Sequence, residues 1–235
     1  MTDTVKPSPA KPKPNPLIEL LITLVIPSLI LMKLSDPEGL GVVNALLLAL
    51  AFPLFWGARD FFARRKLNLF AALGLVSILL TGGIGLLQLD TQWLAIKEAA
   101  IPGLIGLAVA VSAHTRYPLV RVVLFNPTLM NVERIQESLS ERGNQAAFEA
   151  RLKAATWMLG GTFFFSSVMN YLLATWVVVS PAGTPAFNAE LGRLTLLSYP
   201  MIALPSMLLM MAVLFYLTRT IRELAGLKLA EALKH

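Results

Sequence analysis

The sequence predicts an all-α polytopic membrane protein, and three observations carry this prediction. Hydrophobic residues form 56% of the 235 residues and charged residues only 14%, so the mean hydropathy is high, at +0.67. Six apolar runs have nearly the ~20 residues that a helix needs to cross hydrocarbon. The Lys and Arg residues are spread unevenly between these runs. A chain of this length has more apolar surface than one soluble core would bury, so lipid is its expected solvent.

The six apolar runs are predicted to be six transmembrane helices packed in a bundle. Their limits are residues 16–34, 40–57, 67–89, 93–113, 154–179 and 194–217. With six crossings, 17 of the 20 Lys and Arg residues share the side that holds both chain ends, and only Lys33, Lys97 and Arg193 lie on the other. Because Lys and Arg resist translocation, both termini are predicted to lie in the cytoplasm of a bacterial cell.

The first 15 residues differ in composition from the rest, since four prolines alternate there with three lysines. We predict a disordered basic tail over residues 1–15 and a single transmembrane helical domain over residues 16–235. A secretory signal is the competing interpretation of a basic region that precedes an apolar one. The run at residues 17–34 is long for such a signal, and no small-x-small cleavage pattern follows it, so we expect the first helix to be retained.

The longest polar connection runs from Asn126 to Lys153 and separates the first four predicted helices from the last two. In it Leu129, Val132, Ile135 and Leu139 recur at helical spacing among charged residues. This pattern predicts a cytoplasmic amphipathic helix between helices four and five, which either lies on the bilayer or caps the bundle. The alternative is an element that binds a protein partner.

Polar residues inside the predicted spans form the candidate functional site. They are Lys97, Glu98, Asn44, Thr81 and Asn170. An ionisable side chain in a membrane span is costly unless it is paired or hydrated, so Lys97 and Glu98 are the main candidates. Adjacent helical residues point about 100° apart, and each side chain is expected to reach a different wall of an outward-facing cavity. The alternative is that both extend to the outer interface, whose level Trp93 marks.

Four prolines are predicted to interrupt helical hydrogen bonding within the spans. They are Pro27, Pro53, Pro102 and Pro205. Each lacks the N–H that the helix would use, and Pro102 thereby frees the carbonyl of Glu98 for another contact. A charged pair beside an interrupted turn is typical of transporter sites. The similar segments Ile26–Ile30 and Ile101–Ile105 leave open an inverted repeat of three plus three helices.

Several functional classes receive no support from the sequence. The chain has no cysteine, which excludes thiolate nucleophiles and cysteine metal sites. His114 and His235 have no partner at metal-ligand spacing, and no nucleotide-binding or nucleophile motif is present. We expect no enzymatic activity, no catalytic or metal site and no cofactor. The basic residues form no continuous stripe, so nucleic acid is not an expected partner. The expected partners are the lipid bilayer, other membrane proteins and further copies of the chain.

Four segments in predicted helices two to four carry a resemblance to known proteins. They are Leu48–Leu54, Leu73–Ser77, Leu80–Leu86 and Ala95–Pro102. Together they resemble a bacterial group of small multipass proteins that is similar to the intracellular septation protein A family. The resemblance covers about Leu46 to Val120, and the Lys-Glu-Ala-x-x-Pro pattern from Lys97 is its most specific part. It implies an inner-membrane protein associated with septation or envelope maintenance, without catalytic or ligand residues.

Two functions are therefore open. The resemblance favours an envelope or septation-associated membrane scaffold that holds partners through the polar connection. The charges inside predicted spans favour a small transporter or permease for an ion or small solute, with an outward-facing cavity near Lys97 and Glu98. Buried, mutually compensated charges beside a cavity would favour transport, and a closed, dry bundle would favour the scaffold.

Overall fold

The computed structural model describes residues 20–64, 69–115, 118–123, 130–227 and 229–232. In these residues the chain is helical and contains no β-strand, which confirms the predicted all-α class. The elements, with η marking a π-helical segment, are η1 (Leu21–Val25), α2 (Ile26–Lys33), α3 (Gly41–Arg64), α4 (Leu69–Leu86), α5 (Gln92–Ser112), α6 (Leu119–Val123), α7 (Val132–Glu141), α8 (Gln145–Val177), α9 (Pro185–Ser198), η2 (Tyr199–Ala203), α10 (Leu204–Leu224) and α11 (Leu229–Ala232).

Three helical stretches within the described residues are long and apolar enough to cross a membrane. They are Gly41–Arg59, Gln92–Ser112 and the 40-residue stretch Pro185–Leu224. Leu21–Lys33 and Ala72–Leu86 are apolar but shorter. These helices support a membrane protein, while the six crossings and their orientation stay predictions.

Two helices extend beyond the boundaries predicted from hydropathy. α8 begins at Gln145 and continues without interruption through the predicted fifth span, so the last part of the polar connection belongs to this helix. α9 begins at Pro185, where the Thr184 hydroxyl accepts a 3.1 Å hydrogen bond from the Phe187 N–H. A threonine N-cap followed by proline is a strong helix start. The connection before the last predicted span is therefore shorter than the sequence suggested.

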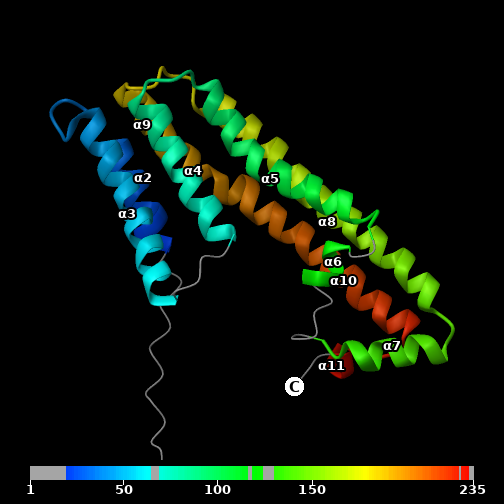
Figure 1. Cartoon of the computed structure of the whole chain (residues 1–235). Coiled ribbons are helices and arrows are strands. Elements are labelled where there is room, and N and C mark those ends of the chain that lie inside the picture. Colours follow the sequence, from blue (N-terminus) through cyan, green and yellow to red (C-terminus); the bar gives the residue numbers. More distant parts are fainter. Residues whose placement is uncertain (1–19, 65–68, 116–117, 124–129, 228, 233–235) are drawn as a thin grey trace, which may run out of the picture.

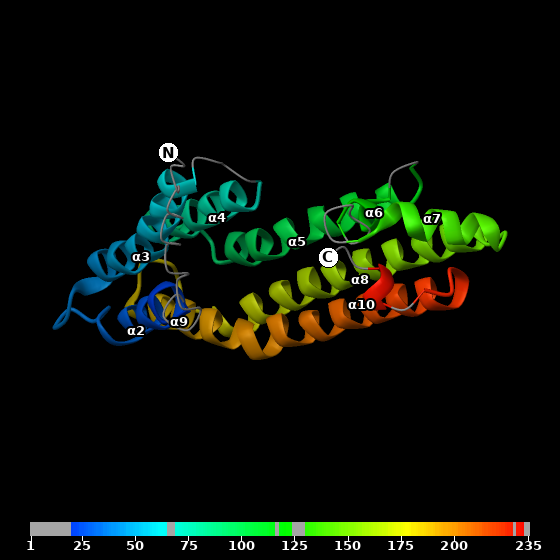
Figure 2. The same cartoon turned by 90° about the horizontal axis from the view of Figure 1, so that it is seen from below.

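The helices form an elongated bundle with a different set of elements at each end. α2, α3 and α4 lie together at one end, and α6, α7 and α11 gather at the other (Figure 1). α5, α8 and the α9–α10 helix run between the two ends. Seen from below, α2 lies beside α9, while α3 and α4 lie on the side of α5 (Figure 2).

The buried residues fall into two cores that correspond to these two ends. The first core includes Leu46, Leu94 and Phe187, and the second includes Val120 and Leu152. α5 and α8 contribute to both cores. Their backbones approach closely, because a Cβ built on Gly106 of α5 would lie 3.3 Å from the carbonyl oxygen of Gly160 on α8. The two glycines thereby allow α5 and α8, which join the two ends, to pack closely.

α7 covers the second core from outside the long helices. Ile135 and Leu139 are buried in that core, the Ser138 hydroxyl donates to the Ala225 carbonyl, and Asn144 Nδ2 donates to the Leu224 carbonyl at 2.9 Å. The apolar face of α7 therefore packs on the chain itself, as a cap on the bundle. Leu129, which belongs to the same predicted pattern, lies outside the described residues, and the cytoplasmic location of α7 stays a prediction.

Replacing Ile135 with Ser is expected to release α7 from the second core, since Ile135 is fully buried. Truncating a buried isoleucine costs roughly 2–5 kcal/mol. Limited proteolysis of membrane vesicles should show faster cleavage between α7 and α8, while membrane insertion is unchanged. Glu137→Ser, on the exposed face of the same helix, is the control. Equal cleavage rates for the two variants would contradict the packing role of Ile135.

Candidate functional site

A cavity of about 370 Å³ lies in the first core, where α2, α3, α4, α5, α8 and α9 meet. Lys97, Glu98, Thr81 and Asn170 all line it, so four of the five candidate residues come together from three helices. Asn44 does not line this cavity. Its side chain is exposed, and its Nδ2 donates to the Leu40 carbonyl of its own helix at 3.0 Å.

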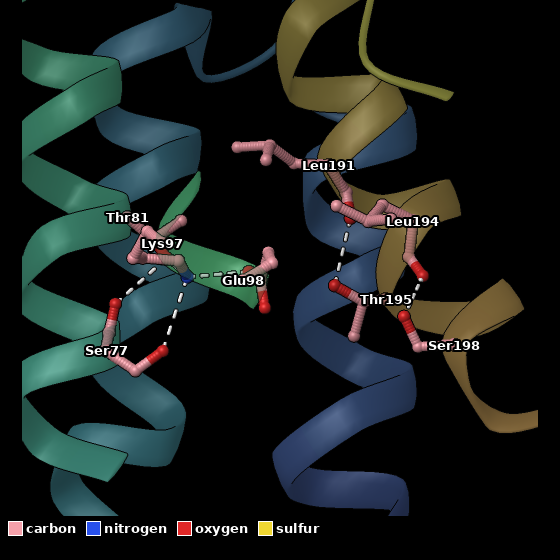
Figure 3. Close-up of polar contacts among 8 residues, drawn as sticks. All are labelled: Ser77, Thr81, Lys97, Glu98, Leu191, Leu194, Thr195 and Ser198. Carbon is pink, nitrogen blue, oxygen red and sulfur yellow. Dashed lines mark hydrogen bonds and ion pairs between the residues drawn. The ribbon is translucent and has the colours of Figure 1, made fainter. Parts of the chain in front are cut away.

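Lys97 is the most buried charge of the cavity, with 6% of its side chain exposed. Its ammonium lies 2.6 Å from the Glu98 carboxylate and donates to Thr81 Oγ1 at 2.7 Å and to Ser77 Oγ at 3.3 Å (Figure 3). An ammonium has three N–H donors, so these three acceptors saturate it. Thr81 is itself held by donating its hydroxyl hydrogen to the Ser77 carbonyl at 3.0 Å.

Lys97 and Glu98 contact each other as well as lining the same cavity. The two side chains start about 100° apart on the helix, but the flexible four-carbon stem of lysine lets the ammonium fold back onto the carboxylate. The ammonium points towards α4 in the interior of the bundle (Figure 3). It therefore does not extend to an outer interface, as the alternative interpretation required.

The wall opposite Lys97 and Glu98 is formed by hydroxyl groups on α9. Thr195 Oγ1 donates to the Leu191 carbonyl at 2.9 Å, and Ser198 Oγ donates to the Leu194 carbonyl at 2.8 Å. Glu98 lies between the Lys97 ammonium and this wall (Figure 3). The sequence analysis missed both hydroxyls, although their spacing of three residues places them on one face of a helix.

Ser28 on α2 adds a further hydroxyl to the cavity lining. The residue is 1% exposed, and its Oγ has no hydrogen-bond partner among the described residues. Leaving a buried polar group unpaired costs about 1–3 kcal/mol. Its position directly after Pro27 was the available sequence signal, and the sequence analysis did not use it.

Pro27 and Pro205 occupy the same local structure in two different helices. Each follows a π-helical segment, η1 before Pro27 and η2 before Pro205. The residue that precedes each proline donates its N–H five residues back, from Ile26 to Leu21 and from Leu204 to Tyr199. Both π segments border the cavity, since Leu24 of η1 and Tyr199 of η2 line it. Such turns occur frequently at functional sites.

Pro53 and Pro102 lie inside continuous helices, α3 and α5, so neither proline ends its helix. Pro53 also lines the cavity. Near Pro102, the carbonyl of Ala99 accepts a 2.8 Å hydrogen bond from Ser167 Oγ on the neighbouring helix α8. The contact predicted for the carbonyl of Glu98 stays a prediction.

A second cavity, of about 400 Å³, lies between α6, α7 and α8 at the edge of the second core, and most of its lining residues are polar. Arg121 of α6 and Glu149 of α8 form an ion pair on its wall. Their positions are 28 residues apart, and no sequence pattern predicted that they pair. Among the described residues, no group of three or more His, Asp or Glu side chains is placed to hold a metal ion.

No family model, curated protein or solved structure matches the chain. The resemblance to the septation protein A family therefore stays an expectation from the residues of helices two to four.

Proposed function

We propose that this chain is a small multipass transporter or permease of the bacterial inner membrane, and that it carries an ion or small solute through the Lys97–Glu98 cavity. The observation that carries the proposal is an ion pair with a buried ammonium and a partly exposed carboxylate on the wall of a cavity of about 370 Å³. Small-ligand sites in proteins typically measure about 300–1,000 Å³.

The free-energy cost of removing the Lys97 and Glu98 charges from water supports a functional role for this ion pair. Replacing a buried ion pair by well-packed apolar residues is often neutral or stabilising, so a bundle that only needs to pack has no use for Lys97 and Glu98. In the proposal, Glu98 contacts the solute and Lys97 is a positioning residue, held against α4 by Ser77 and Thr81. The π segments next to Pro27 and Pro205 supply helical turns that can bend as the cavity opens.

The proposed topology has six crossings with both termini inside. It rests on the 17 to 3 distribution of Lys and Arg residues, and it adds α2, α4 and α8 to the three helices that qualify by length and composition. A reporter active only in the periplasm is expected to be silent after His235 and active when inserted near Gly183. Strong activity at the C-terminus would contradict this topology.

A scaffold associated with septation is the second candidate function. It is favoured by the exposed charged face of α7, which includes Glu133, Arg134 and Glu137. Ile135 and Leu139 on the other face are occupied by the second core, so a partner would have to bind through charge rather than apolar contact.

The absence of cysteine allows the transport proposal to be tested with single-cysteine variants. Thr195→Cys places a thiol in the cavity, Glu38→Cys is an exposed control, and Ala155→Cys is a buried control in the second core. A membrane-impermeant thiol reagent is expected to label Thr195→Cys at a rate between those of the two controls. The same protein in liposomes should take up at least one member of a panel of small cations, anions and neutral solutes. No uptake above protein-free liposomes for any member of the panel would overturn transport, and no labelling from either side of the membrane would show that the cavity is closed to solutes.

A further inference from the structure

We infer that the cavity binds an organic cation of the protonated alkylamine type. This inference rests on the proposed function, because it names the class of solute that the same site would take. It follows from three features of the cavity: which end of the ion pair faces it, which hydrogen-bonding groups remain available, and what covers the rest of the wall.

The cavity faces the negative end of the ion pair. All three N–H donors of Lys97 are used by Glu98, Thr81 and Ser77, and its side chain is 6% exposed, against 30% for Glu98. A ligand in the cavity therefore meets the carboxylate and not the ammonium. An anion would find no available charged donor there, and would approach a carboxylate of like charge.

Thr195, Ser198 and Asn170 present acceptors to the cavity, while the unpaired Ser28 hydroxyl can either donate or accept. The Thr195 and Ser198 hydroxyls donate their hydrogens to backbone carbonyls, which leaves only oxygen lone pairs for a ligand. Asn170 Nδ2 donates to the carbonyl and hydroxyl of Ser166 at 2.8 and 3.3 Å, which leaves its Oδ1 as an acceptor. With the Glu98 carboxylate, these oxygens match the several N–H donors of an ammonium group.

The remaining wall is apolar, and Leu24, Leu31, Leu50 and Ile78 belong to it. A volume of about 370 Å³ greatly exceeds the ~30 Å³ share of one water molecule in the liquid, so the space suits more than a bare monovalent metal ion. An ammonium group near Glu98 and Thr195, with a short hydrocarbon chain against the leucines, would use both kinds of wall.

Binding to the purified full chain in lipid nanodiscs tests this inference with three probes of one chain length. Isothermal titration calorimetry with butylammonium, butyrate and butanol is expected to show butylammonium binding at least tenfold more tightly than butanol, with no binding of butyrate. Glu98→Gln should remove this preference. Because that variant loses a charge partner, Thr195→Val with Ser198→Ala is the second test, and it should weaken butylammonium binding at least fivefold. Thr175→Val, whose hydroxyl also donates to its own helix but lies outside the cavity lining, is the matched control.

Each other outcome has a defined meaning. Equal or tighter binding of butyrate or butanol would overturn the inference, and so would an unchanged affinity in the double hydroxyl variant. Complete displacement of butylammonium by an equal concentration of sodium ions would assign the site to a metal ion. It would overturn the inference that the ligand is an organic cation. Uptake of anions without binding of butylammonium would overturn this inference alone, whereas binding of butylammonium without uptake of any solute would overturn transport alone.

Discussion

Glu98→Gln is expected to destabilise the protein more than Lys97→Gln, and the double variant is expected to be more stable than Glu98→Gln alone. Removing Glu98 strands the buried ammonium with two hydroxyl acceptors, whereas removing Lys97 leaves a carboxylate that is 30% exposed. Breaking a buried pair typically costs 3–5 kcal/mol, and we expect about 3 kcal/mol for Glu98→Gln because the pair is partly exposed.

Thermal unfolding of the parent and the three variants in detergent measures this order. The control is Arg219→Gln, which breaks an exposed ion pair of the same 2.6 Å separation on α10 and should have little effect. If both single variants and the double variant unfold at the temperature of the parent, Lys97 and Glu98 are not a coupled buried pair. The structural basis for the cavity proposal would then be lost.

Gly192→Ala is expected to push α2 away from α9 and to disturb the cavity between them. A Cβ at Gly192 would lie 2.7 Å from the Ser28 carbonyl oxygen and 2.8 Å from Met32 Cγ. The methionine side chain can move aside, but the carbonyl belongs to the backbone of α2 and moves only with the helix. Overpacking of this kind typically costs about 1–3 kcal/mol.

Gly161→Ala is the matched control, because a Cβ there meets no atom within 4 Å. Alanine in a helix interior is favoured over glycine by about 1 kcal/mol, so this control should be as stable as the parent or more stable. Thermal unfolding compares the two variants, and labelling of a cysteine at position 195 reports on the cavity. A Gly192→Ala protein with the stability and labelling rate of the parent would contradict the close approach of α2 and α9.

The features of the fold and of the site that could be predicted are those in which polar and apolar residues differ within one segment of the sequence. The apolar runs are visible because polar residues interrupt them, and Lys97, Glu98, Thr81 and Asn170 stand out for the same reason. The continuity of α8 was not predictable from hydropathy. Its first turns from Gln145 are polar, and they are helical because helix-forming residues such as Ala146 and Ala147 fill them.

The residues of the site that were missed become recognisable only when helices far apart in the sequence are brought together. Ser28, Thr195 and Ser198 are ordinary helix residues in the sequence, and hydroxyls of this kind usually bond to their own backbone. They matter only because α2 and α9 bring them to the cavity that Lys97 and Glu98 reach from α5. Asn44 shows the opposite error, since its polarity stood out in an apolar run but its side chain bonds within its own helix.

The π segment between α9 and α10 holds one residue more than an ordinary α turn. Deleting one residue from Tyr199–Ala203 would let an ordinary α turn form in place of the wider one, and the residues on either side would keep the direction they face. Val213 and Leu217 would then stay in the second core, and Thr195 would keep its place at the cavity. A deletion from a regular α turn of α10 before Val213 would instead rotate every later residue by about 100° and shift it by about 1.5 Å along the axis. Related chains should therefore tolerate a gap of one residue in this turn far better than a gap in the regular part of α10.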